Sequence, residues 1–190
     1  MRIKYKLEKY KEIERTIIKN YRKKIWQKFI RGINEFEMIH KWFSDKKPTS
    51  AELLLDAKIN NNFYQAFFEK CGNVPNTMIF IKTTEGERFG GYTSVIWPIH
   101  GKSKDTESFL FSLSKKGKYK VINPESAIGV SKNGYISFGC GNDLWICNDS
   151  NSRGGGTTKV NYDIPGNQFS LNRGKEHFKL LNCEIYQIEF

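Results

Sequence analysis

The N-terminal quarter of the chain carries a regular apolar stripe. Between Ile3 and Phe43 an apolar residue recurs every three or four positions, with a mean step of about 3.6 residues, the repeat of an α-helix. Lysines fill the other face, and no proline interrupts the pattern before Pro48. The pattern predicts a basic amphipathic helix over residues 1–47. Its one weak point is Gly32, where glycine costs about 1 kcal/mol relative to alanine.

Two short helices are expected after this segment. Thr49 and Glu52 have the spacing of a capping box, which predicts a short helix over residues 53–58. Asparagines then interrupt the chain. A second helix is expected over residues 63–70, with Gly72 as its left-handed C-terminal cap.

From Thr77 onward the pattern is that of β-strands separated by turns. Hairpins are expected at Gly86 and at the Asn133-Gly134 pair, which is a strong two-residue turn signal. The stretch "DSNSRGGGTTK" is expected to be a polar loop. The expected strands lie in "TMIFIKT", "FGGYTSVIW", "FLFSLS", "KYKVI", "AIGVS", "SKNGYISF", "DLWICN" and "HFKLLNCEIYQIEF". These segments predict an α+β fold, an antiparallel β-sandwich with short flanking helices, preceded by the long basic amphipathic helix.

The distribution of charge divides the chain at the same place. The formal net charge is +11, and residues 1–48 hold 15 Lys and Arg against 6 Asp and Glu. The remaining residues hold 16 against 14 and are nearly neutral. With 38% apolar and 14% aromatic residues, the chain can form a folded core. We therefore expect two parts, a basic helical extension over residues 1–47 and a sandwich domain over residues 48–190.

Several classes of site are disfavoured by the sequence. The four cysteines form no CxxC pair and the three histidines lack ligand spacing, so no metal site is expected. No cofactor is expected either. No signal peptide is evident, and no apolar run approaches the ~18 residues that cross a bilayer. These features predict a cytoplasmic protein with reduced thiols, in association with a membrane complex or the cytoskeleton.

The sequence offers no complete catalytic motif. "RGGGTTK" resembles a phosphate loop, but no glycine immediately precedes its lysine and no strand-to-helix context surrounds it. The nucleophile elbow G-x-S-x-G is absent. Glu125, Asp143 and Glu184 could form a carboxylate pair in three dimensions, although hydrogen bonding to loop backbone is the role we expect. We therefore predict that the protein is not an enzyme.

Two glycine pairs stand in or next to expected strands. Glycine weakens a strand and has no side chain to pack, so Gly90 and Gly91 in "RFGGYTSVIW" require an explanation. The same holds for Gly139 and Gly141 in "FGCGN". Each pair would let the strand bulge or let another backbone come within contact distance. We interpret all four as architectural glycines, and an anion-binding nest is the alternative.

The later motifs resemble those of a known family. "FGGYTSVIW", "FLFSL", "FGCGNDLWICN" and "CEIYQI" occur in the order and spacing of the TLDc domain, over about residues 51–190. The resemblance implies a β-sandwich with flanking helices, as in eukaryotic oxidation-resistance proteins, and a link to binding of the vacuolar proton-pumping ATPase. Most members carry Phe-Gly-Gly-Gly where this chain has Cys140 in the third position. Cys140 is thus a departure from the family pattern.

The helical extension is the segment where we expect a partner to bind. A single helix of this length would span about 60 Å, whereas the radius of gyration of the sandwich would be near 14–15 Å. Either the helix folds back at Gly32 or part of its stripe faces another chain. Packing on its own domain, nucleic acid and an anionic membrane are the alternatives to a protein groove. The expected partner-binding residues are Ile17, Tyr21, Ile25, Trp26, Gln27, Phe29, Arg31, Ile33 and Phe36.

Part of this stripe also resembles an IQ motif, the helix that calmodulin-like proteins bind. "WQKFIRG" has Gln27 and the Arg31-Gly32 pair at the right spacing, but Trp26 and Phe36 depart from the motif. The predicted function is a non-catalytic interaction module docked through its helix to an assembly such as the vacuolar ATPase. A structural role in a cytoskeletal or ciliary assembly, with calmodulin binding, is the first alternative. The second is oxidative-stress protection through weak redox chemistry, for which Cys140 is the candidate exposed thiol.

Overall fold

The computed structural model describes residues 29–43, 46–57, 63–147 and 154–190. The chain divides into two compact units, residues 1–51 with Phe190 and residues 52–189. The predicted boundary after residue 47 stays a prediction. No helix in the described ranges is long and apolar enough to cross a bilayer.

The first unit contains one described helix, α2 (Ile33–Trp42). The residues before it, 29–32, are not helical, so the stripe does not continue as one helix through Gly32. Glu35, in the first turn, accepts a hydrogen bond from the Arg31 backbone N–H at 2.7 Å, which helps to fix where the helix begins. The remainder of the predicted helix, residues 1–28, lies outside the described ranges.

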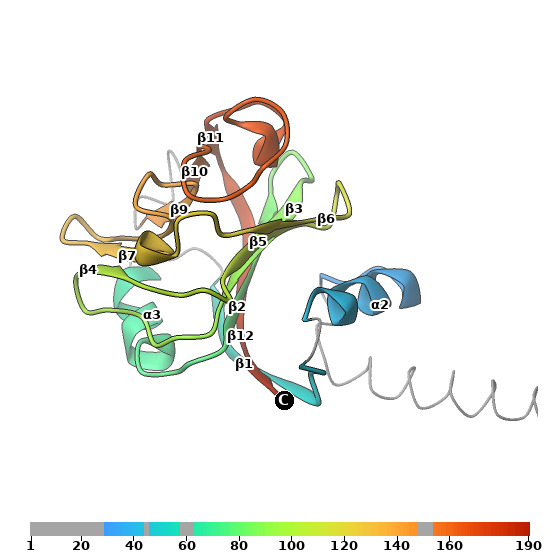
Figure 1. Cartoon of the computed structure of the whole chain (residues 1–190), viewed down its shortest axis with the longest axis horizontal. Helices are drawn as coiled ribbons and strands as arrows, with labels where there is room; N and C mark the ends of the chain where they lie inside the picture. The colour runs from blue at the N-terminus through green and yellow to red at the C-terminus, as the bar shows by residue number, and fades with distance from the viewer. Residues whose placement is uncertain (1–28, 44–45, 58–62, 148–153) are drawn as a thin grey trace, which may run out of the picture. The chain divides into compact units, whose positions relative to one another are not determined.

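The second unit is built from antiparallel strands and one α-helix (Figure 1). The strands of the first sheet are, in spatial order, β1 (Ser50–Ala57), β12 (Leu180–Glu189), β2 (Thr77–Thr83), β3 (Arg88–Thr93), β5 (Phe109–Ser112) and β6 (Gly117–Lys120). Those of the second sheet are β11 (His177–Phe178), β10 (Gly155–Thr157), β9 (Leu144–Cys147), β8 (Tyr135–Phe138), β7 (Ile128–Ser131) and β4 (Gly101–Ser103). The helix is α3 (Phe63–Cys71), and short 3-10 turns are η1 (Pro124–Ser126) and η2 (Ser170–Asn172).

The core of this unit lies between the two sheets. Phe89 of the first sheet meets Phe178 of the second, with ring centroids 5.2 Å apart, and Trp97 lies 5.3 Å from Phe138. Helix α3 adds Phe63, Phe67 and Cys71 to the same cluster. The predicted antiparallel sandwich with short helices is confirmed, and α3 and both predicted hairpins are present.

One predicted element is wrong. The capping-box pattern at Thr49 predicted a helix over residues 53–58, but residues 50–57 form strand β1 beside β12. Leu55 and Ala57 are buried and Asp56 between them is exposed, which is the two-residue period of a strand. Pairing along the sheet has overridden a local signal worth only about 1 kcal/mol.

Two further segments differ from the expected pattern. Part of the predicted glycine-rich loop is strand β10, which lies between β9 and β11. The expected single final strand is two strands, because the chain leaves the second sheet after Phe178 and enters the first at Leu180. The C-terminal segment therefore passes from one layer of the sandwich to the other between Phe178 and Leu180.

Candidate functional site

The turn between β8 and β9 is held by backbone hydrogen bonds to a neighbouring segment. Gly139 has φ of +77°, a left-handed conformation that favours glycine. Its backbone N–H donates to Ala127 O at 2.7 Å, and the N–H of Cys140 donates to Ser126 O at 3.2 Å. The turn is therefore fixed to the segment that precedes β7.

The carboxylate of Asp143 organises the backbone beside this turn. Its Oδ1 accepts hydrogen bonds from the backbone N–H groups of Val160, Asn161 and Tyr162 at 2.7, 2.8 and 3.1 Å. Oδ2 is buried and has no hydrogen-bond partner within the described residues. A Cβ on Gly139 would lie 2.2 Å from Oδ2. Burial raises the pKa of Asp143, and the three backbone hydrogen bonds oppose that rise.

Gly141 completes the turn through two polar contacts. Its N–H donates to Asn161 Oδ1 at 3.1 Å, and its carbonyl accepts from Thr158 Oγ1 at 2.7 Å. A Cβ on Gly141 would lie 2.5 Å from the Cβ of Val160, a side chain that is 58% exposed. The absence of a side chain thus lets residues 158–162 lie against the turn.

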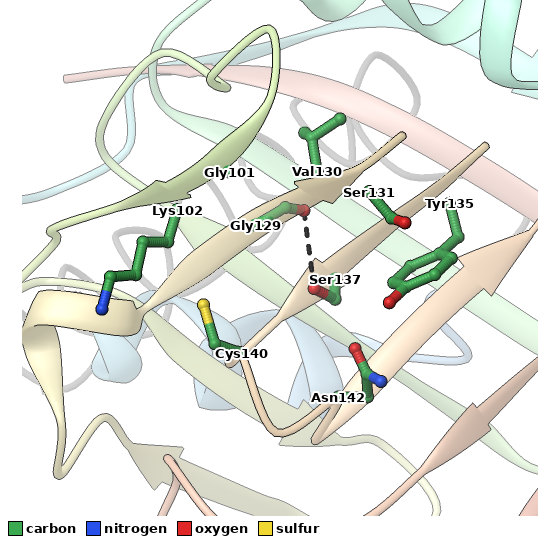
Figure 2. Close-up of a pocket in the computed structure, with 9 residues that line it drawn as sticks. All are labelled: Gly101, Lys102, Gly129, Val130, Ser131, Tyr135, Ser137, Cys140 and Asn142. Atoms are coloured by element: carbon green, nitrogen blue, oxygen red, sulfur yellow. Dashed lines mark hydrogen bonds between the residues drawn. The ribbon is translucent and has the colours of Figure 1, made fainter. Parts of the chain in front are cut away.

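A shallow cavity of about 260 Å³ lies beside the turn, on the outer face of the second sheet (Figure 2). Strands β4, β7 and β8 and the turn all contribute to it. The lining residues are Gly101, Lys102, Gly129, Val130, Ser131, Tyr135, Ser137, Cys140 and Asn142. Lys102 is the only charged residue among them. Sequence reasoning did not find this cavity, because its residues come from four segments that only the fold brings together.

The first glycine pair lies inside β3, where the register with β2 is regular from Thr77 to Lys82. The strand therefore has no bulge at this pair. The remaining explanation is the close approach of neighbouring atoms to the glycine backbone. A Cβ on Gly90 would lie 1.8 Å from Ile79 O, and a Cβ on Gly91 would lie 2.6 Å from the Phe138 ring. Both distances are far inside van der Waals contact. That these glycines are architectural stays a prediction, and these contacts are its physical basis.

The three candidate carboxylates have separate partners. Asp143 accepts hydrogen bonds from backbone N–H groups, whereas Glu125 forms an exposed ion pair with Lys104. Glu184 accepts a hydrogen bond from the Tyr186 hydroxyl at 2.7 Å. In the described ranges no three His, Cys, Asp or Glu side chains are grouped so that they could hold a metal ion.

Asp105 is a buried carboxylate that the sequence reasoning missed. Asp105 accepts hydrogen bonds from Thr93 Oγ1, from the N–H and hydroxyl of Ser94, and from the N–H of Glu107, all between 2.7 and 2.9 Å. The bond to the Glu107 N–H is a local Asx turn, which the sequence could have suggested. The bonds to Thr93 and Ser94 depend on the fold.

The cysteines differ in their exposure. Cys71 and Cys183 are buried, and burial raises the pKa of Cys71 to about 12 and that of Cys183 above its ordinary value. Cys147 is half-buried. Cys140 is exposed and is one of the residues that line the cavity.

The predicted partner-binding residues are only partly described. Ile17, Tyr21, Ile25, Trp26 and Gln27 lie outside the described residues. Phe29 and Phe36 are buried, with exposed fractions of 1% and 6%. Arg31 is exposed and Ile33 is half-buried.

The family comparison agrees with the resemblance seen in the motifs. A family model described as the TLDc domain matches residues 27–189. The match begins upstream of residue 51, so the residues of α2 are included in it. No curated protein matches the chain.

Proposed function

Because this chain belongs to the TLDc domain family, we propose that it is a non-catalytic protein-interaction module that docks onto a larger assembly, with the vacuolar proton-pumping ATPase as first candidate. The observation that carries the proposal is the charge distribution. Residues 1–48 hold 15 basic and 6 acidic side chains along an apolar stripe, and the rest of the chain is nearly neutral. The expected setting is the cytoplasmic side of a membrane complex.

The buried acids of the sandwich support a scaffold role. Asp105 and Asp143 each accept several hydrogen bonds from backbone or hydroxyl groups. Their carboxylates fix the loops after β3 and β10. Acids used in this way stabilise a loop conformation. We infer that the sandwich presents surfaces rather than performing a reaction.

Docking through the basic segment would combine two contributions, apolar burial and electrostatic attraction. Burying each large apolar side chain of the stripe contributes roughly 1.5–3 kcal/mol. The surrounding lysines speed the encounter with an acidic surface and make it sensitive to salt. The apolar contacts would therefore set the affinity, and the charges would set the association rate.

A calmodulin-like partner is less favoured by the described residues. An IQ helix would have to run through the Phe29–Gly32 stretch, which is not helical, and Phe29 is buried. Binding would first have to release and refold this stretch. An acidic cytoskeletal or ciliary polymer is the other alternative partner, and it would use the same lysines.

Redox protection is the second candidate function because Cys140 is exposed. The raised pKa of Cys71 and of Cys183 makes both poor nucleophiles. Redox chemistry would therefore depend chiefly on Cys140, because Cys147 is half-buried. A Cys140→Ser variant that loses peroxide protection while keeping partner binding would support this function.

Affinity capture with the full chain tests the proposal. The bait is compared with an Ile17→Asp, Tyr21→Asp, Ile25→Asp variant, because Phe29 is buried and its substitution would disturb packing. We expect mass spectrometry to find subunits of the vacuolar ATPase with the unchanged chain and to lose them with the variant. Capture of tubulin or actin instead would favour the cytoskeletal alternative, and calcium-dependent capture of calmodulin would favour the IQ alternative.

A further inference from the structure

A row of cross-strand neighbours runs over the outer face of the second sheet, away from the core. The strand register places Lys102 beside Gly129, Gly129 beside Ser137, and Ser137 beside Trp145. The row continues through Gly156 to His177. The cavity of Figure 2 lies at the Lys102 end of this row.

The cavity is lined by hydrogen-bond donors and by one positive charge. The Lys102 ammonium donates one bond, to Ser126 Oγ at 3.3 Å, so two of its three N–H groups remain. Ser131 Oγ accepts from the Asn133 N–H at 3.0 Å and keeps its own proton to donate. The Tyr135 hydroxyl and the Asn142 amide face the same space (Figure 2). No carboxylate is among the nine lining residues, so this set of groups suits an anion.

Trp145 lies next to the cavity and is only half-buried. A Cβ on Gly156 would lie 2.5 Å from the indole Nε1, so the ring lies against the backbone of β10. His177 meets the ring edge-on and Tyr135 meets it at a tilt, each with centroids 5.9 Å apart. Within the described ranges the indole N–H donates no hydrogen bond. A held, half-exposed tryptophan with a free donor is a typical anchor for a peptide.

We propose that this outer face binds an extended acidic segment of a partner protein. Its carboxylate enters the cavity beside Lys102, and an apolar or aromatic side chain packs on Trp145. Three strand steps of about 4.8 Å separate Lys102 from Trp145, roughly 14 Å in all. An extended chain rises about 3.3 Å per residue, so the two side chains stand about four residues apart in the partner.

A peptide fits better than a free small anion. The cavity of about 260 Å³ is smaller than the ~300–1,000 Å³ of typical small-molecule sites. A small anion would also leave Trp145 uncovered. The proposal does not depend on docking through residues 1–47, because the nine lining residues all belong to the sandwich.

The test is a titration of the ¹⁵N-labelled full chain followed through its four tryptophan indole signals. The probe is acetyl-Glu-Ser-Gly-Ser-Phe-amide, and a Trp145→Phe variant assigns the signal of Trp145. We expect this signal to shift and saturate in the millimolar range. The same peptide with Gln in place of Glu is expected to bind about five-fold more weakly, the loss of one partly exposed ion pair.

A matched pair of variants gives the control. Lys102→Gln is expected to weaken the Glu peptide about five-fold, and Lys120→Gln, an exposed lysine of the first sheet, is expected to leave binding unchanged. The proposal is overturned if the Trp145 signal does not move, or if both peptides bind alike. Equal shifts with sodium acetate alone would show a small-anion site and would also overturn it. Loss of binding with the Ile17→Asp, Tyr21→Asp, Ile25→Asp variant would contradict its independence from residues 1–47.

Discussion

The two glycine pairs of the sandwich do different physical work. In β3, Gly90 and Gly91 have ordinary strand register, and their missing side chains make room for a carbonyl and a phenyl ring of the core. In the β8–β9 turn, Gly139 supplies a left-handed conformation and Gly141 makes room for Val160. The first pair therefore faces neighbours in the core, and the second faces neighbours at a surface that adjoins the cavity.

A glycine pair after a phenylalanine thus occurs in two different structural settings, which the sequence alone does not distinguish. Both pairs follow a phenylalanine, Phe89 in one case and Phe138 in the other, and both phenylalanines are buried. Only the neighbours from distant segments distinguish them. Substitutions at each pair should sharpen this contrast.

The largest effect is expected at Gly90. A Gly90→Val change places a Cβ 1.8 Å from the Ile79 carbonyl, an atom of the neighbouring strand that cannot move without breaking the sheet. We expect a loss of about 4 kcal/mol in the free energy of unfolding, measured by thermal or urea melts. An unchanged melting temperature for both Gly90→Val and Gly91→Val would show that these glycines are not architectural.

The next effect concerns the carboxylate beside the turn. Asp143→Ala removes the acceptor of three backbone N–H groups, two of them buried. We expect a loss of about 3 kcal/mol, with residues 158–162 released first in hydrogen exchange. If the amides of Val160, Asn161 and Tyr162 keep their protection, the carboxylate does not hold this segment.

A smaller loss is expected at Gly141. A Gly141→Ala side chain would press on Val160, which is 58% exposed and can turn towards solvent. We expect a cost of about 1 kcal/mol, well below that at Gly90. Equal costs at the two sites, compared in parallel urea melts, would remove the distinction between core and surface glycines.

The smallest effect is a change in pH dependence. Burial raises the folded-state pKa of Asp143 above the unfolded value of about 3.9, so the folded state holds the proton more tightly. Ionisation of Asp143 as the pH rises above about 4 therefore lowers stability, until the folded-state pKa has been passed. Asn at position 143 does not ionise, so the Asp143→Asn variant has no such pH dependence. The free energy of unfolding of the wild type should therefore fall relative to that of the variant as the pH rises from about 4 to the folded-state pKa. Parallel urea melts from pH 4 to 7 measure it, and a constant difference would contradict the raised pKa.

Local signals predicted much of the sandwich. The apolar run of β2 and the Asn133-Gly134 turn each specify their element without help from distant residues. The helix prediction for residues 53–58 failed because the capping signal is local and weak. The pairing of β1 with β12, which forms a strand there instead, joins segments far apart in the sequence. Strand β10 was not predicted because its glycines are typical of a loop. A Cβ on Gly155 would lie 2.1 Å from Trp145 O, a close approach that the sequence does not reveal.

The candidate site was less predictable than the fold. Cys140 could be identified as exposed because glycines flank it, and it is exposed. The bonds of Asp143 to residues 160–162 and the grouping of Lys102 with Tyr135 depend on which strands become neighbours. No spacing in the sequence encodes that adjacency.

The central claim is that the sandwich is a scaffold and that the basic segment recruits the partner. Recruitment of the Ile17→Asp, Tyr21→Asp, Ile25→Asp variant to purified vacuolar ATPase, in parallel with its thermal melt, tests this claim most directly. We predict that recruitment is lost while the melting temperature stays within about 2 °C of the unchanged chain, and that neutralising two lysines of the segment only weakens recruitment in a salt-dependent way. Recruitment that survives the three aspartates but disappears in moderate salt would contradict the account, because the segment would then be an electrostatic tether alone.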